Sequence, residues 1–142
     1  MENAVRLSAM AFRAFWVINL LIGVFAAFTR SAPAWVGVHV AIGMVIVILL
    51  FFLGLPQALG KGGSLVLMAG TFMVGLGVAL IGMTQTLVTN LIAFRIIQTL
   101  HIFLVVSAIA LAEICVRRYF GGLAAQRATT SSAQSDAGSP PA

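Results

Sequence analysis

Four long apolar runs, separated by short stretches rich in polar residues, glycine and proline, organise the chain. They cover residues 11–28, 34–55, 65–83 and 91–116. Each run is about 18 to 26 residues long, and a helix needs roughly 20 residues to cross the hydrocarbon core of a bilayer. Backbone amides in lipid must hydrogen-bond within their own segment, so the runs are predicted to be helices and not buried strands. Residues 1–120 are therefore predicted to form an all-α membrane domain, a bundle of four transmembrane helices.

The last part of the chain, residues 121–142, has a different character. It is dominated by Ala, Ser, Thr, Gly, Gln and Pro, and it has no hydrophobic periodicity. Such a segment cannot bury enough apolar surface to offset the entropy lost on ordering. We predict that it is a disordered cytoplasmic tail.

The composition supports a lipid environment. Of the 142 residues, 61% are hydrophobic and only 8% are charged, whereas soluble domains are about half apolar and a quarter charged. A soluble protein with this composition would not have enough polar residues to cover its surface.

The net charge of +5 reflects topology and not nucleic-acid binding, because the basic residues flank apolar runs and form no cluster. Six of the eight lie at the N-terminus, in the connector between the second and third runs, or after the fourth run: Arg6, Arg13, Lys61, Arg117, Arg118 and Arg127. Only Arg30 and Arg95 belong to the opposite side. The positive-inside rule then predicts a multi-pass protein of the bacterial inner membrane with both termini in the cytoplasm.

Ionisable side chains inside apolar runs are costly in lipid and indicate function. The only two histidines of the chain, His39 and His101, fall in the second and fourth runs. Both runs are predicted to cross from outside to inside. At about 1.5 Å per residue, the histidines lie roughly 8 Å and 14 Å below the same surface, so they share one leaflet.

Two histidines at similar depth on parallel helices could supply both axial ligands of one haem, because neutral imidazole is a standard axial ligand. Gly43 lies one turn after His39 and would leave room for a flat macrocycle. The same pattern is compatible with a structural pair that hydrogen-bonds between helices, with another ligand such as a chlorophyll-type pigment, or with a proton path. Helix rotation, which the sequence does not fix, decides whether the rings face each other.

Three more residues could serve a haem at this site. The propionates would point to the outer surface, where Arg30 and Arg95 are the available cations. Gln98 lies one turn before His101 and could hydrogen-bond a ring nitrogen. At the other end of the fourth run, Glu113 is predicted to form an i to i+4 ion pair with Arg117.

Two short segments, His-Val-Ala-Ile-Gly at 39–43 and Gln-Thr-Leu-His-Ile-Phe-Leu at 98–104, carry a family resemblance. Their layout resembles one four-helix half of haem A synthase and, more loosely, the cytochrome b561 class of membrane haem proteins. The resemblance implies that His39 and His101 are axial metal ligands. Cytochrome b561 proteins hold two haems with four histidines, so the two histidines here imply a single bis-histidine haem b. Haem A synthase also has a second half and catalytic carboxylates, which are missing here, so catalysis by this chain alone is not expected.

The expected function is that of a small haem b subunit that transfers electrons within a respiratory or quinone-linked membrane complex. Its partners would be the lipid bilayer, other membrane subunits or a second copy of the chain, and a quinone or redox protein. The alternative is a cofactor-free accessory subunit, since glycine-rich helices also suit close packing beside a larger membrane protein.

Overall fold

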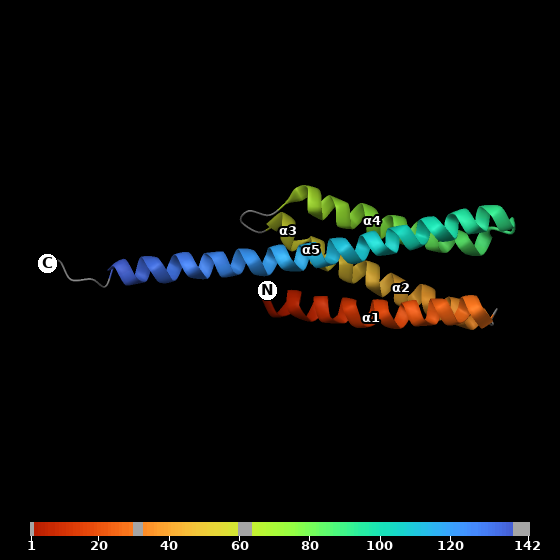
Figure 1. Cartoon of the computed structure of the whole chain (residues 1–142), viewed down its shortest axis with the longest axis horizontal. Coiled ribbons are helices and arrows are strands. Elements are labelled where there is room, and N and C mark those ends of the chain that lie inside the picture. The colour runs from red at the N-terminus through yellow and green to blue at the C-terminus, as the bar shows by residue number, and fades with distance from the viewer. Residues whose placement is uncertain (1, 30–32, 60–63, 138–142) are drawn as a thin grey trace.

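The computed structural model describes residues 2–29, 33–59 and 64–137, and this part of the chain is all-helical. Figure 1 shows its elements, which are α1 (Glu2–Thr29), α2 (Pro33–Gly54), α3 (Pro56–Leu59), α4 (Leu65–Thr84), the 3₁₀ helix η1 (Gln85–Leu87) and α5 (Leu91–Ala137). Four of these helices, α1, α2, α4 and α5, are long and apolar enough to cross a membrane. The prediction of four such helices is confirmed.

Local sequence features set several helix boundaries. Helix α2 ends at Gly54, and Pro56, two residues later, begins the single turn of α3. This turn lies in a segment that the sequence analysis treats as a connector. The Ser64 hydroxyl accepts a hydrogen bond from Leu67 N at 3.2 Å and caps α4. Asn90 Oδ1 accepts from the amides of residues 92 and 93 at 2.9 and 3.1 Å, and thereby starts α5.

The largest difference from the sequence prediction is the length of α5. This helix does not end at residue 116 but continues to Ala137, so the segment expected to be disordered is helical from residue 121 to that point. The segment is rich in alanine, the best helix former, and prolines follow only at positions 140 and 141. An ion pair of 2.7 Å between Arg127 and Glu2 ties this extension to the start of α1. Residues 138–142 lie outside the described part.

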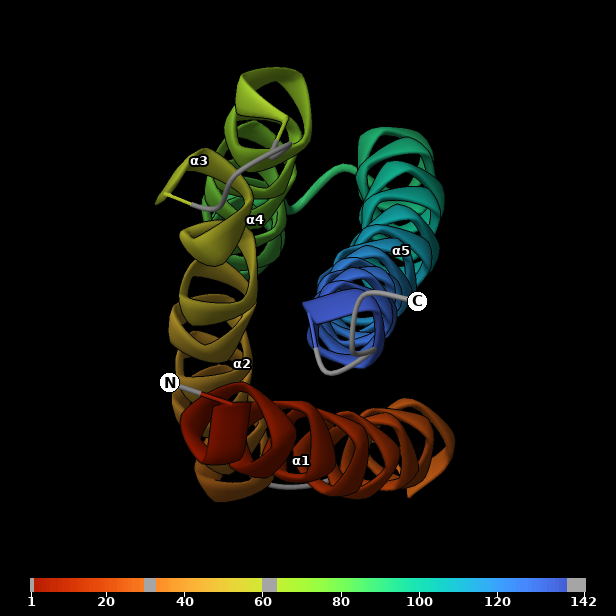
Figure 2. The ribbon, with the colours of Figure 1, turned by 90° about the vertical axis from the view of Figure 1, so that its left-hand side faces the viewer.

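The four long helices form a ring in the order α1, α2, α4, α5. Each packs against the next, α5 returns to α1 over a short contact only, and α2 and α5 also touch across the ring (Figure 2). We call the end of the bundle near Glu2 and α3 the proximal end, and the end near η1 and the start of α5 the distal end. The hairpins α1–α2 and α4–α5 diverge toward the distal end (Figures 1 and 2).

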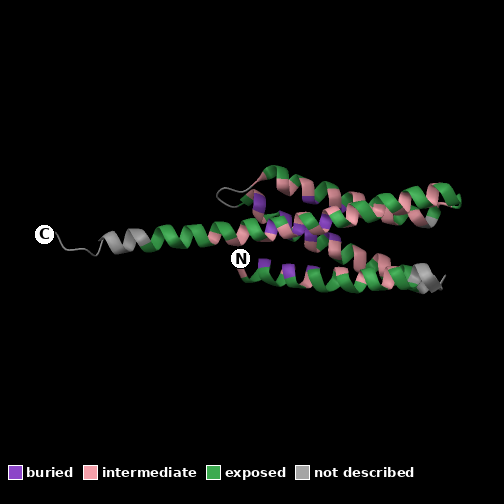
Figure 3. Cartoon of the chain, in the orientation of Figure 1, coloured by how far each residue is buried: buried purple, intermediate pink, exposed green. Residues whose placement is uncertain are grey.

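The packed core fills only the proximal half of the bundle (Figure 3). Among residues whose burial is described, the last buried residue of α1 is Phe12 and that of α4 is Gly75, while the first of α2 is Val47 and that of α5 is Ala108. Every residue between these positions and the distal end whose burial is described is at least partly exposed. The distal half is therefore held together without a core of its own.

Candidate functional site

His39 lies on α2 in the distal half, about 9 Å along the helix from Pro33 at 1.5 Å per residue. Its imidazole packs against Gly23 of α1, where an added Cβ would lie 2.8 Å from His39 Cε1. This close approach brings His39 Nδ1 to 3.1 Å from the backbone oxygen of Asn19, one turn before the glycine. A carbonyl oxygen can only accept, so Nδ1 carries a proton and donates it, and Nε2 is the ring nitrogen left for another partner.

His101 occupies a matching position in the other hairpin. It lies on α5 about 15 Å from Leu91 and packs against Gly82 of α4, where an added Cβ would lie 2.9 Å from His101 Cε1. The local environments differ in one respect. His101 Nδ1 is buried and has no hydrogen-bond partner in the described chain.

The structure brings the two histidines into one region. Their helices, α2 and α5, face each other across the ring and touch, and each histidine lies on the distal side of the first buried residue of its helix. Each hairpin holds one imidazole against a glycine, in the half of the bundle where every residue whose burial is described is at least partly exposed as a whole. The predicted common depth of the two histidines is thus accompanied by a shared, sparsely packed surrounding.

The other predicted site residues are less closely grouped. Gly43 faces α1, because an added Cβ would lie 3.5 Å from the side-chain nitrogen of Asn19. Gln98 is half-buried and, among the residues that the structure describes, hydrogen-bonds neither histidine. Arg30 lies outside the described residues.

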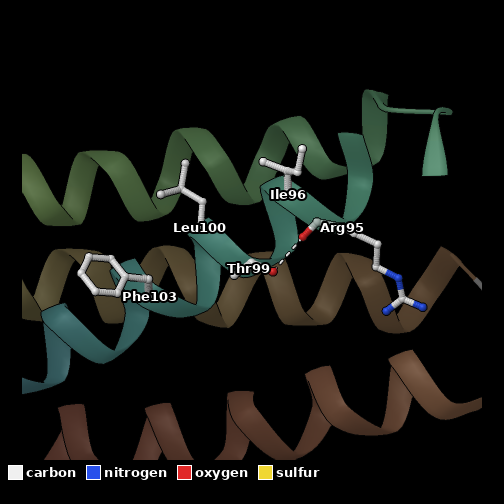
Figure 4. Close-up of a pocket in the computed structure, with 5 residues that line it drawn as sticks. All are labelled: Arg95, Ile96, Thr99, Leu100 and Phe103. Carbon is white, nitrogen blue, oxygen red and sulfur yellow. Dashed lines mark hydrogen bonds between the residues drawn. The ribbon is translucent and has the colours of Figure 1, made fainter. Parts of the chain in front are cut away.

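Arg95 lines an open groove on α5, with a volume of about 520 Å³, together with Ile96, Thr99, Leu100 and Phe103 (Figure 4). Thr99 Oγ1 donates to the Arg95 backbone oxygen at 2.9 Å, while the guanidinium extends away from the helix (Figure 4). At about 100° per residue, Thr99 and His101 are separated by roughly 200° around the helix, so the groove and the imidazole are on opposite sides of α5. Arg95 therefore belongs to a different surface from the histidine.

The structure corrects the predicted partner of Glu113. Its carboxylate accepts two hydrogen bonds from Arg13 of α1, at 2.7 and 2.8 Å. The ion pair of Glu113 is therefore with Arg13 and not, as predicted, with Arg117. The bidentate geometry explains this choice, because two parallel charge-assisted bonds are stronger than a single flexible contact within one helix. This pair joins α1 to α5 at the proximal side of the histidines.

Asn19 is the neighbour of His39 that sequence reasoning missed. Its backbone oxygen accepts from His39, and its own side-chain oxygen is buried without a hydrogen-bond partner in the described chain. The signal was available, since an amide side chain in the middle of an apolar run is costly in lipid. What it could not indicate is that the backbone of this residue would be the contact.

The described residues contain no group of three or more His, Cys, Asp or Glu side chains that could hold a metal ion. Two imidazoles alone suit a metal that brings its own equatorial ligands. A haem iron is such a metal, and axial imidazoles complete its coordination.

Comparison with known protein families, curated proteins and solved structures finds no match for this chain. The fold and the arrangement around the two histidines are therefore the basis for assigning a function.

Proposed function

We propose that this chain is a small membrane haem protein in which His39 and His101 are the axial ligands of a single haem b. The observation that carries the proposal is the hydrogen bond from His39 Nδ1 to the Asn19 backbone oxygen, because it leaves Nε2 as the ring nitrogen available to a ligand. Metal-bound histidines characteristically donate their other ring N–H to a carbonyl or carboxylate.

The packing of the distal half supports the same proposal. Protein interiors are close-packed, and the proximal half of this bundle has a core of that kind. The two hairpins diverge toward the distal end (Figure 1), and every residue of the distal half whose burial is described, both histidines included, is at least partly exposed. A flat macrocycle held between one histidine of each hairpin would fill this half.

In this proposal each residue of the site has a distinct role. His39 and His101 hold the iron, and Gly23 and Gly82 let the imidazoles sit against the neighbouring helices. With both axial positions occupied, a haem supplies one-electron transfer and not oxygen binding. Arg95, which is exposed near the distal end, is the described cation nearest to where propionates would emerge, and it would have to bend around α5 to reach them.

In this proposal the chain crosses the bacterial inner membrane four times with both termini in the cytoplasm. The excess of Lys and Arg at the proximal end and in the C-terminal segment supports that orientation. The distal half, with the histidines, then lies toward the outer surface. Since the chain offers one redox centre, it would pass electrons between partners, as a subunit of a respiratory or quinone-linked complex.

The test is the haem stoichiometry of the full-length protein, purified in detergent from haem-replete cells. The proposal predicts one non-covalently bound haem b per chain, measured as the pyridine haemochrome against protein concentration. A stoichiometry near zero would support the cofactor-free accessory subunit instead.

A further inference from the structure

The two imidazoles differ in the hydrogen bonding of Nδ1. Each ring packs against a glycine of the preceding long helix, at 2.8 Å for His39 and 2.9 Å for His101, measured from Cε1 to an added Cβ. His39 Nδ1 donates to a backbone oxygen, whereas His101 Nδ1 is buried without a partner in the part of the chain that the structure describes. The steric environment is the same, and the hydrogen-bonding environment is not.

This difference affects how well each ring would bind a metal. A carbonyl that accepts from Nδ1 fixes the tautomer, orients the ring and makes Nε2 a more basic ligand. Losing such a partner typically lowers metal affinity by about 10- to 100-fold. His39 has this support and His101 lacks it.

The packing around the two histidines is similar. In α2 no residue from 35 to 46 is buried, and in α5 none is buried before Ala108. Both imidazoles are therefore carried on stretches of helix without a packed core, and the hydrogen bonding of Nδ1 is what distinguishes them.

We infer that the two ligands are unequal: His39 is the permanent ligand, and His101 is exchangeable, so that the site binds a small neutral ligand such as carbon monoxide on the His101 side. The inference rests on the proposed haem and goes further, because it gives a bis-histidine centre one coordination position that can open. The difference in hydrogen bonding at Nδ1 identifies His101 as the ligand that can leave.

The experiment compares His39→Ala with His101→Ala in the full-length protein. Haem content is measured first, and then the spectrum of the reduced protein with carbon monoxide. We expect His101→Ala to retain most of its haem in a form that binds carbon monoxide rapidly and is returned to six-coordination by added imidazole. We expect His39→Ala to retain about 10- to 100-fold less haem at limiting haem concentration.

Gly23→Ala is the second variant, and it keeps both histidines. The added Cβ pushes on His39 Cε1 and weakens its bond to Asn19, so this variant should retain less haem than the wild type, as His39→Ala does, and an unchanged haem content would contradict the role of His39 as the permanent ligand. Equal haem loss in both histidine variants, with a haem-containing wild type, would overturn the inference and leave the proposed function standing. A haem-free wild type would overturn both.

Discussion

Gly23 on α1 lies against the imidazole of His39 on α2, so closely that a Cβ at position 23 would lie 2.8 Å from Cε1. The same contact brings His39 Nδ1 within 3.1 Å of the Asn19 backbone oxygen. The absence of a side chain at one position thus creates a hydrogen bond at another, and that bond sets the tautomer of the histidine.

The first prediction concerns this glycine. Gly23→Ala should displace the ring and break its bond to Asn19, lowering haem affinity by about 10- to 100-fold. Haem titration of the purified apoprotein measures the change. Gly37→Ala is the matched control, since an added Cβ there meets nothing within 4 Å, and it should bind haem as the wild type does. Equal affinities for the two variants would contradict the role assigned to Gly23.

The second prediction concerns the ion pair between Arg13 and Glu113, which joins α1 to α5. A double-mutant cycle with Arg13→Gln and Glu113→Gln should give a coupling free energy of about 0.5–1 kcal/mol, because the pair is bidentate but partly exposed. Unfolding in mixed detergent micelles measures it. The same cycle with Arg117→Gln in place of Arg13→Gln should give a smaller coupling, because Arg117 acts on Glu113 without a hydrogen bond. A larger coupling to Arg117 would restore the pairing expected from the sequence.

The third prediction concerns orientation. Cys115 is the only cysteine and is buried, so Cys115→Ala provides a background for single-cysteine labelling. A membrane-impermeant maleimide should label Thr89→Cys in spheroplasts, and Thr130→Cys only after the membrane is opened, because the basic residues favour cytoplasmic termini. The reverse pattern would place the histidines in the cytoplasmic leaflet.

The fourth prediction concerns the extension of α5. Deleting residues 121–142 should lower the total far-ultraviolet helical signal per molecule, because helix extends as far as Ala137 in the intact chain. The hydrogen bond between Arg127 and Glu2 would be lost at the same time. If the truncated and full-length proteins gave the same molar ellipticity per molecule, the segment would be disordered, as its composition alone suggests.

Much of the fold could be predicted from hydrophobic run length, because lipid forces every spanning backbone into helix. The end of α5 could not be predicted in this way. The sequence analysis judged residues 121–137 by how much apolar surface they could bury, whereas their alanine content and the ion pair between Arg127 and Glu2 favour a helix without burial.

The candidate site divides in the same way. The positions of His39 and His101 along their helices could be predicted from run length and helix rise, and the structure places both residues in the distal half of the bundle. Their contacts with Gly23 and Gly82 depend on helix rotation, which run length does not encode. For the same reason the contact between His39 and the Asn19 backbone oxygen could not be predicted from the sequence.

The most direct test of the haem proposal is the visible spectrum of the purified protein, oxidised and then reduced with dithionite. The account predicts a sharp α-band in the reduced wild type that is absent from His39→Ala and from His101→Ala, because each variant removes one of the two axial ligands. A colourless wild type from haem-replete cells, or an α-band that survives in both variants, would contradict it.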